Sequence, residues 1–246
     1  MRCYKKRMIE RYERQISMDQ IGSAGQEKLA NSAIFVIGAG GLGSPALTYL
    51  AAAGVGCLGL MDGDRVAPGN LNRQFLHGES DINRAKARSA AEALGRRNSE
   101  IDIRAYETYL TEENAKTHLT GYDIILGAVD SFSVRSLINR TCLSLGVPYI
   151  DGGVSGFSGC VLYANPPESP CLNCIFPEKS EEKEAVGVLG ATAGVIGTAM
   201  ANIALLVLLG LENPIRNKLF LYDGLRMRTD LIAIRRDEKC GVCGGL

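Results

Sequence analysis

The sequence predicts an α/β fold in which a mostly parallel sheet is flanked by helices and followed by a β-rich C-terminal part. Short apolar runs alternate with helical patterns from residue 33 to residue 152, which is typical of βαβ units. The first apolar run meets the glycine-rich turn GAGGLG (38–43), where a helical pattern begins, as in Rossmann-like sheets. After about residue 153 the pattern changes to hairpin-like β segments and two pairs of cysteines.

The alternating pattern assigns the elements in turn. Residues 8–29 predict polar amphipathic helices and turns. Apolar strands are expected at residues 33–37, 57–61, 101–106, 122–128 and 147–152. Helices are expected at residues 43–53, 83–98, 112–119 and 132–145. Proline and glycine punctuate residues 65–77, which therefore predict a loop.

The C-terminal part combines a β segment at residues 157–163, an uncharged stretch at residues 186–211 and further β structure. The charged run 177–185 predicts a solvated loop, and its length and position also allow a mobile crossover. The uncharged stretch is long enough to span a bilayer, but its first third is rich in glycine and threonine and no aromatic belt flanks it. Only Ala199–Leu209 is strongly apolar, so we expect a loop that enters a buried core helix.

Length and composition describe an ordinary enzyme. The 246 residues suffice for one large α/β domain, or for one domain with an elaborated C-terminal part. Lys+Arg and Asp+Glu balance at 27 each, so no global field attracts nucleic acid or a membrane, and we expect neither as a partner. No export signal follows the basic N-terminus, which predicts a cytoplasmic location where the eight cysteines are thiols or metal ligands rather than disulfides.

The glycine-rich turn predicts a phosphate cradle. Gly38, Gly40 and Gly43 fit the pattern G-x-G-x-x-G, and Gly41 adds a fourth glycine. Backbone N–H groups in such a turn approach phosphate oxygens, and the helix that follows adds the positive end of its dipole. Asp62 ends the next strand, where a carboxylate can bind ribose hydroxyls. Taken alone, this motif favours an NAD-dependent oxidoreductase.

Polar residues beyond the second strand shift the prediction toward ATP. They are Asp64, Asn70, Asn72, Arg73, Gln74 and Lys86. A site that splits ATP must neutralise three phosphates with Arg, Lys and a metal ion, whereas an oxidoreductase needs few such cations. Asp130 follows the fourth apolar strand, at the sheet edge where ligands bind, and its carboxylate could hold Mg²⁺. Singly, Arg73 and Lys86 could be surface cations and Asp130 a helix cap, but their combination favours the ATP site.

These motifs together resemble the MoeB/ThiF/HesA family, bacterial relatives of the ubiquitin-activating enzymes. The motifs are RYERQ (11–15), GAGGLGS (38–44), DGD (62–64), NLNRQ (70–74), Lys86 and AVD (128–130). The resemblance runs from about residue 8 to the C-terminus. It implies adenylation, with ATP, of the C-terminal glycine of a small ubiquitin-like sulfur-carrier protein that ends in Gly-Gly.

The resemblance also implies a role for each site residue. Asp62 would bind the ribose, and Arg73 and Lys86 would contact the phosphates. Further nucleotide contacts would come from Asp64, Asn70, Gln74 and the glycines 38, 40, 41 and 43. Asp130 would place Mg²⁺, and Arg14 would reach into the partner subunit's ATP site, which implies a symmetric homodimer. No general base is needed because the attacking carboxylate is already ionised, so these residues act by positioning and charge stabilisation.

Two C-x-x-C pairs predict a structural metal site. Cys171 with Cys174 and Cys240 with Cys243 supply four thiolates, which suits a closed tetrahedral Zn²⁺ site that clips the end of the chain to the segment before the charged loop. A redox C-x-x-C usually opens a helix in a thioredoxin-like unit, which neither pair does, and unrelated thiols would not pair in this way. The remaining cysteines are expected to be inert, with Cys57, Cys142 and Cys160 in predicted elements and Cys3 in the terminal tail.

One departure from the family concerns the crossover loop. Many members carry a reactive cysteine there, but residues 177–192 contain none, and Lys183 stands at the corresponding position. No rhodanese-like extension follows Leu246. We therefore expect the reaction to stop at the acyl-adenylate and a separate sulfur donor to complete the transfer.

The sequence thus predicts an ATP-dependent adenylyltransferase for sulfur transfer of the thiamine or molybdopterin type. Its parts are an N-terminal helical arm (1–30), a nucleotide-binding part (31–153) and a C-terminal subdomain (154–246), joined in one continuous domain. An NAD(P)-dependent oxidoreductase stays open as an alternative, but it leaves NLNRQ, Lys86 and Arg14 unused. A related enzyme that adenylates a peptide also stays open, while the intact charged residues argue against a non-catalytic partner subunit.

Overall fold

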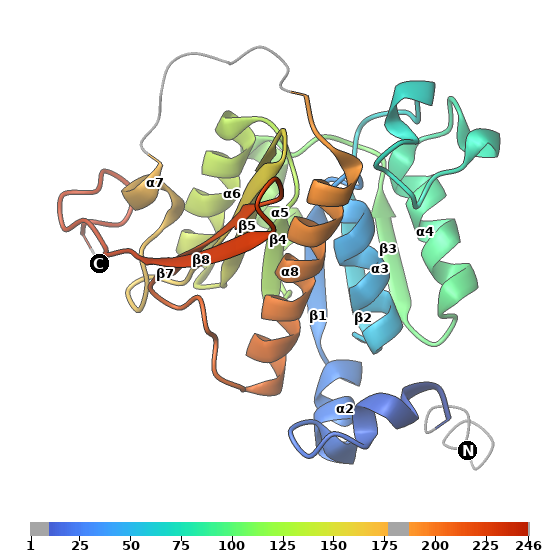
Figure 1. Ribbon diagram of the computed structural model, residues 1–246, viewed down its shortest axis with the longest axis horizontal. Helices are drawn as coiled ribbons and strands as arrows, with labels where there is room; N and C mark the ends of the chain where they lie inside the picture. The colour runs from blue at the N-terminus through green and yellow to red at the C-terminus, as the bar shows by residue number, and fades with distance from the viewer. Residues whose placement is uncertain (1–9, 177–186, 246) are drawn as a thin grey trace.

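The computed structural model describes residues 10–176 and 187–245. Within them, eight strands form a single sheet in the order β3-β2-β1-β4-β5-β6-β7-β8 (Figure 1). The strands are β1 (Ala33–Ile37), β2 (Cys57–Met61), β3 (Asp102–Tyr106), β4 (Ile124–Gly127), β5 (Tyr149–Ser155), β6 (Ser158–Ala164), β7 (Lys218–Asp223) and β8 (Arg228–Ala233). The predicted fold class, a Rossmann-like α/β sheet, is confirmed.

Helices cover both faces of this sheet. They are α2 (Gly22–Ala30), α3 (Gly43–Ala53), α4 (Lys86–Arg97), α5 (Glu112–Leu119), α6 (Phe132–Leu145), α7 (Leu172–Ile175) and α8 (Gly190–Leu209). Residues 10–16 form a further helical segment, and short 3₁₀ turns occupy Pro68–Asn70 and Glu79–Asp81. The alternation of side chains along β1 feeds two cores: Ile34 and Val36 pack with α3, α4 and α8, whereas Phe35 and Ile37 pack with α5 and α6.

The sheet changes character at β5. Strands β1 to β5 run parallel, while β5, β6, β7 and β8 pair antiparallel. The reversal after β5 uses Gly156, whose φ of 58° lies in the left-handed region that favours glycine. The hairpin-like β structure predicted for the C-terminal part is therefore confirmed, and it extends the parallel sheet rather than forming a separate one.

Helix α8 corrects one prediction. Residues 190–198 were expected to be a loop, but they form the first half of the helix. Glycines in this half let the helix backbone pack closely, because no side chain would fit. A Cβ on Gly197 would lie 2.2 Å from the carbonyl oxygen of Leu42, and a Cβ on Gly190 would lie 2.4 Å from the carbonyl oxygen of Asn72. By length and composition α8 could cross a membrane, but 50% of its most apolar window is buried, and the helix packs on α3, β5 and β6 as the predicted core helix.

The strand order places a ligand crevice beside β1. From β1 the chain crosses to β2 on one side and later to β4 on the other, so the order reverses between β1 and β4. Ligands of open α/β sheets bind outside the carboxyl ends of the strands at such a switch point. The glycine-rich turn stands there, because β1 ends at Ile37 and α3 begins at Gly43.

Candidate functional site

The glycine-rich turn is tight enough to exclude side chains at two positions. Gly38 has a φ of 96°, and a Cβ there would lie 2.5 Å from the carbonyl oxygen of Ala128. A Cβ on Gly43 would lie 1.9 Å from the carbonyl oxygen of Gly38. Because the turn folds back on itself this closely, its peptide groups face the crevice without side chains, as a phosphate cradle requires.

Asp62 joins the end of β2 to this turn. Its Oδ2 accepts the backbone N–H of Ala39 at 2.8 Å, and its Oδ1 accepts that of Asp64 at 2.9 Å. A carboxylate has about four acceptor positions, so lone pairs remain for ribose hydroxyls. The residue therefore has a structural contact with the turn, and its ribose-binding role stays a prediction.

The loop after β2 brings Gln74 over the glycine-rich turn. Its side chain is 5% exposed, and its amide nitrogen lies 3.5 Å from where a Cβ on Gly40 would stand. Among the described residues, no donor reaches its Oε1, which is buried. A buried amide oxygen without a donor is costly, so this atom fits a polar ligand at the turn. Asn70, by contrast, uses its Oδ1 to accept the backbone N–H of Ala67 at 3.1 Å and shapes the loop.

Arg73 lies between this loop, the glycine-rich turn and the beginning of α8. Its Nη1 donates to the carbonyl oxygen of Gly69 at 2.9 Å and to Oδ1 of Asn72 at 3.0 Å. Its side-chain stem lies beside Gly41 and Gly190. Both partners are neutral, so no acid in the described part of the chain compensates the guanidinium charge, which suits an anionic ligand.

Lys86 is held by an acid. It begins α4, its side chain is only 8% exposed, and its Nζ lies 2.8 Å from Oδ2 of Asp64. The other oxygen of Asp64 accepts the hydroxyl of Tyr109 at 2.6 Å. Hydrogen bonds from Lys86 and Tyr109 lower the pKa of Asp64, so this carboxylate stays ionised at neutral pH. The buried ammonium of Lys86 is therefore paired with an ionised and partly exposed acid.

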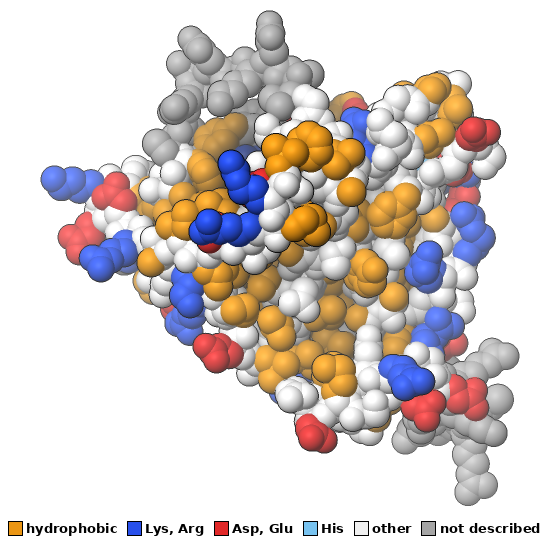
Figure 2. Space-filling view, in the orientation of Figure 1, with side chains coloured by type: hydrophobic (Ala, Val, Ile, Leu, Met, Phe, Trp, Pro, Cys, Tyr) orange, Lys and Arg blue, Asp and Glu red, His pale blue; other side chains and the backbone are white. Residues whose placement is uncertain are grey.

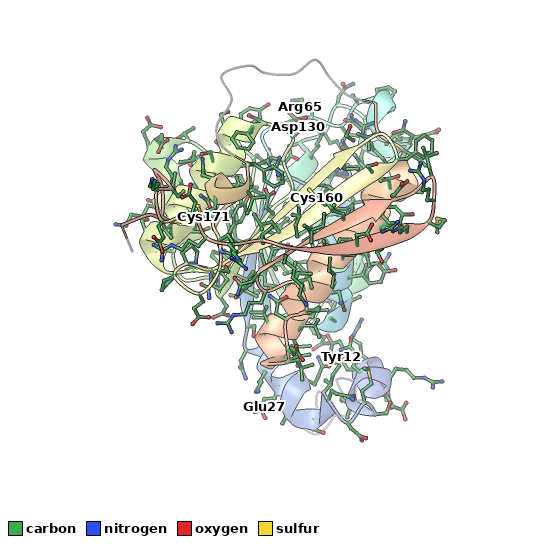
Figure 3. The ribbon with its side chains drawn as sticks, turned by 60° about the vertical axis from the view of Figure 1, so that its left-hand side comes forward. Tyr12, Glu27, Arg65, Asp130, Cys160 and Cys171 are labelled. Carbon is green, nitrogen blue, oxygen red and sulfur yellow. The ribbon has the colours of Figure 1, made fainter. Side chains whose placement is uncertain are left out.

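Asp130 stands past the end of β4, directly before α6. Its carboxylate is exposed, and it makes no hydrogen bond or ion pair with any residue in 10–176 or 187–245. Figure 3 places Asp130 and Arg65 at the same end of the molecule, at the opposite end from Tyr12 and Glu27. An exposed carboxylate with free oxygen atoms is a ligand that Mg²⁺ accepts.

Arg14 is the predicted site residue that the chain does not bring to the crevice. Its helical segment packs at the far ends of two helices: Gln15 donates to the carbonyl oxygen of Ala53 at 3.1 Å, and Arg11 donates to that of Arg97 at 3.0 Å. Helices α3 and α4 begin at the crevice and end here, and α3 alone is about 16 Å long. The exposed Arg14 therefore lies too far away to serve the site of its own chain.

Two further residues belong to the site although the sequence did not single them out. Tyr109 lies in the connection between β3 and α5 and fixes Asp64. His77 ends the loop that carries Arg73 and Gln74, and it is 5% exposed. His77 follows the NLNRQ motif, and Tyr109 follows the end of β3. A tyrosine or a histidine in a loop is too common to predict a site residue, so only the contacts in the structure identify these two.

The four paired cysteines come together as predicted. The sulfur atoms of Cys171, Cys174, Cys240 and Cys243 all lie within 4.8 Å of one another, and three of these residues are buried. Neighbouring sulfurs are 3.4 to 3.7 Å apart. Sulfurs about 2.3 Å from a tetrahedral Zn²⁺ would lie about 3.8 Å apart, so the donor set and its size both fit this ion.

The other cysteines match their predicted places in part. Cys142 is buried, and burial raises its pKa. Cys160 is half-buried, and desolvation also raises its pKa, so its thiol stays protonated. Cys57 was expected in the core but is half-buried, with its sulfur 3.7 Å from Oδ2 of Asp102, because β2 is followed only by the edge strand β3. Cys3, Lys183 and the charged run 177–185 lie outside the described residues.

Comparison with known proteins identifies the family. The model of the ThiF family matches residues 12–242. The chain belongs to the ThiF family. A sulfur carrier protein adenylyltransferase of Thermus thermophilus is 39% identical over 98% of this chain and 93% of its own length. A sulfur carrier protein ThiS adenylyltransferase of Escherichia coli is 39% identical over 96% of this chain and 95% of its own length.

Family membership sets the enzyme class. The chain is an adenylyltransferase, a class that uses ATP, and the NAD-dependent interpretation of the glycine-rich turn loses its support. A crystal structure of Escherichia coli MccB with ATP superposes with a TM-score of 0.84, covering 95% of this chain and 74% of that chain. At 23% identity, that likeness shows that the two chains share a fold.

Proposed function

We propose that this protein adenylates the C-terminal glycine of a small ubiquitin-like sulfur-carrier protein that ends in Gly-Gly. One observation supports the proposal: Arg73 lies beside Gly41 of the glycine-rich turn, and Ala128, next to the end of β4 and two residues before Asp130, packs against Gly38. Lys86 pairs with Asp64, two residues after the Asp62 carboxylate that binds the same turn, so the proposed set combines two cations and one free carboxylate with a phosphate cradle. An oxidoreductase has no use for this set, whereas cleavage of ATP requires it. The names of the two relatives support the carrier as the second substrate.

The chemistry follows from the charges. A carboxylate oxygen of the carrier attacks the α-phosphorus of ATP, the bond to the bridging oxygen breaks, and pyrophosphate leaves with the electron pair. The attacking group is already ionised at neutral pH, so no proton has to be removed. Two anions must nevertheless approach each other, and the protein lowers this barrier by fixing the phosphates and neutralising their charge.

Each predicted residue has a place in this scheme. Arg73 and Lys86 neutralise the triphosphate, and Lys86 shares its protons between the phosphates and Asp64. Asp62 takes the ribose hydroxyls, while Gln74 offers its unpaired amide oxygen to the nucleotide. Asp130 holds Mg²⁺, which neutralises charge on the phosphate oxygens when it is bound.

The homodimer explains where Arg14 acts. A symmetric partner brings Arg14 across to the crevice that its own chain cannot reach. An apolar surface is available for such a contact, because Figure 2 looks onto α8 and hydrophobic side chains gather over it. On this surface Leu205 and Leu208 are only half-buried, and Val195 is 38% exposed. Twofold interfaces are self-complementary, and an uncharged helix face meets its own copy without burying charge.

The chain then divides by role. The arm (1–30) serves the partner's site, the middle part (31–153) holds ATP, and the C-terminal subdomain (154–246) closes around Zn²⁺. The reaction ends at the acyl-adenylate, and a separate sulfur donor in the cytoplasm, where thiols stay reduced, completes a pathway of the thiamine or molybdopterin type.

Carrier-dependent exchange of radiolabelled pyrophosphate into ATP tests the proposal. We expect exchange with ATP, Mg²⁺ and a carrier ending in Gly-Gly, and none when the final glycine is deleted from that carrier. Thiamine-type and molybdopterin-type carriers, offered separately, identify the pathway. Tight binding of NAD together with no exchange for either carrier would refute the proposed function.

A further inference from the structure

A buried histidine connects the parts of the ATP site. His77 is 5% exposed, its Nδ1 lies 2.9 Å from Oγ of Ser89, and its Nε2 lies 3.2 Å from the carbonyl oxygen of Ala39. Its backbone N–H donates to the carbonyl oxygen of Gln74 at 3.0 Å. No role in the chemistry above requires an imidazole, so these contacts need another explanation.

The two partners fix where the proton of the ring lies. A carbonyl oxygen only accepts hydrogen bonds, so Nε2 must carry the hydrogen and donate it to Ala39. Nδ1 lies against the hydroxyl of Ser89, which can donate or accept and which is also hydrogen-bonded to the carboxylate of Asp81. The contact with Ala39 therefore fixes a hydrogen on Nε2, and both ring nitrogens have a partner.

These contacts join three segments that carry ATP-binding groups. Ala39 belongs to the glycine-rich turn, and Ser89 stands on α4 one helical turn after Lys86. His77 itself ends the loop of Arg73 and Gln74. A single ring therefore sets the spacing between the phosphate cradle and the two segments that bring its cations.

The contact to Ala39 also sets the direction of a backbone donor. A peptide unit is planar, with its C=O and the following N–H pointing in opposite directions. Since the carbonyl of Ala39 points at His77, the N–H of Gly40 points away from it. Within the described residues this N–H donates no hydrogen bond, whereas the N–H of Ala39 is held by Asp62 at 2.8 Å.

We propose that His77 is a positioning residue that aims the Gly40 N–H at a phosphate oxygen of ATP by holding the carbonyl of Ala39. The inference rests on the proposed function, because it names how that site is kept in shape. It assigns His77 no proton transfer and no contact with the nucleotide. Without the imidazole donor, the Ser44 hydroxyl at 3.3 Å is the only donor among residues 10–176 and 187–245 that remains to hold this carbonyl, and the peptide is free to tilt.

The surroundings keep the ring neutral. Burial lowers the pKa of His77 below its ordinary value of 6.5, and the positive charge of Lys86 lowers it further. The contact to Ala39 and the carboxylates of Asp62 and Asp81 oppose this shift, but burial prevails. The tautomer needed for the geometry is therefore present at neutral pH.

Two amide variants separate the two ring contacts. In His77→Gln the amide N–H replaces the Nε2 donor to Ala39, whereas in His77→Asn the shorter amide replaces only the acceptor toward Ser89. We expect the KM for ATP in pyrophosphate exchange to stay within about twofold of wild type for His77→Gln and to rise about tenfold for His77→Asn. The control is His118→Gln, the same change at the other histidine of the chain. His118 lies on α5 and packs against Tyr106 of β3.

Melting temperatures of the three variants distinguish positioning from simple support of the fold. Equal KM values for His77→Gln and His77→Asn, with both melting temperatures lowered, would overturn the inference, and so would an unchanged KM in both.

A spectroscopic test does not depend on activity. The chain has two histidines, so ¹⁵N-histidine NMR spectra give two ring systems, and His118→Gln assigns them. We expect His77 as the neutral Nε2–H form at pH 7, and the Nδ1–H form, which has no hydrogen on Nε2 to donate to Ala39, would overturn the inference. If the wild-type protein exchanges pyrophosphate without a carrier, the proposed function is refuted. The inference about His77 is still tested in that case, because the NMR spectra report its tautomer without any assay of activity.

Discussion

Lys86 shows how a single charge can be made ready for ATP without destabilising the protein that holds it. A buried ammonium without a partner would lose its proton or cost several kcal/mol, and Asp64 at 2.8 Å prevents this. Asp64 is itself half-exposed, so the pair is open on one side. A triphosphate can therefore approach the same ammonium without separating it from its acid.

Replacing this lysine should damage catalysis more than folding. We expect Lys86→Gln to lower kcat for pyrophosphate exchange by about 100-fold or more, since a charge that faces the transition state is lost. Lys116→Gln, on the exposed side of α5, should leave kcat unchanged. A kcat within a factor of three of wild type for Lys86→Gln would show that Lys86 does not stabilise the transition state.

Asp81 gives a pH-dependent contribution to stability. The backbone N–H of Gly78 and the Arg84 guanidinium hold the pKa of Asp81 below its ordinary value of 3.8. A lowered pKa adds stability above pH 3.8, and this stability is lost as the pH falls through the folded-state pKa. We expect Asp81→Asn to melt about 3 °C below wild type at pH 7 and the gap to close as the pH falls through the folded-state pKa of Asp81, measured by calorimetry. A gap that widens on acidification would contradict this sign.

The sequence could supply most of this site but not its internal contacts. Asp62, Lys86 and Asp130 were predictable because each stands next to a strand end or at a helix start. Arg73 was predictable only through the NLNRQ motif, because it lies in a loop. His77 and Tyr109 were not, because their role lies in a contact with Ala39 or Asp64, and no spacing along the chain encodes that contact. Arg14 was predicted to serve the partner subunit's site, and its own fold takes it to the opposite end of α3 from the crevice of its own chain.

Among the elements, α8 packs so closely that its glycines cannot be replaced freely. A Cβ on Gly197 would lie 2.2 Å from the Leu42 carbonyl oxygen and 2.5 Å from Pro45, whereas one on Gly194 would have no heavy atom within 4 Å. We expect Gly197→Ala to lower the free energy of unfolding by about 2 kcal/mol or more. The matched variant Gly194→Ala should raise it by up to about 1 kcal/mol, because alanine favours a helix. Urea unfolding of both proteins measures the difference, and equal effects would refute close packing at Gly197.

The same glycines explain why half of this helix escaped prediction. Three glycines and two threonines between residues 190 and 198 have low helix propensity, so local preference indicated a loop. The helix forms because its backbone can then approach the carbonyl oxygens of Leu42 and Asn72. By contrast, β1, β2, α3, α5 and α6 begin and end at the predicted residues, because apolar period and local propensity agree in each.

At the scale of the whole molecule, the position of Arg14 predicts complementation between inactive subunits. Arg14→Ala and Asp130→Ala should each abolish exchange, yet a mixed dimer contains one site with both native residues. Random mixing should therefore restore about one quarter of the wild-type activity. Exchange assays after subunit mixing, with dimers verified by analytical ultracentrifugation, test this. Verified mixed dimers without activity would exclude a shared site.

The cysteine cluster predicts that metal content and stability change together. We expect one Zn²⁺ per chain by atomic emission, and Cys174→Ser should lose it and melt about 10 °C lower. Cys57→Ser, which removes a half-buried thiol outside the cluster, should keep the ion and its melting temperature. Loss of the metal without any change in melting temperature would show that the ion does not hold the C-terminal part in place.

That cluster also has a consequence for synthesis of the protein in the cell. Cys171 and Cys240 stand 69 residues apart, so a ribosome adding about 5–20 residues each second needs roughly 3–14 s to supply the second pair after the first. During this interval, the thiols of Cys171 and Cys174 are on the nascent chain without the other two metal ligands, Cys240 and Cys243. The first pair therefore has no complete metal site until the second pair is made, so slowed elongation should lengthen the time during which new chains lack the metal.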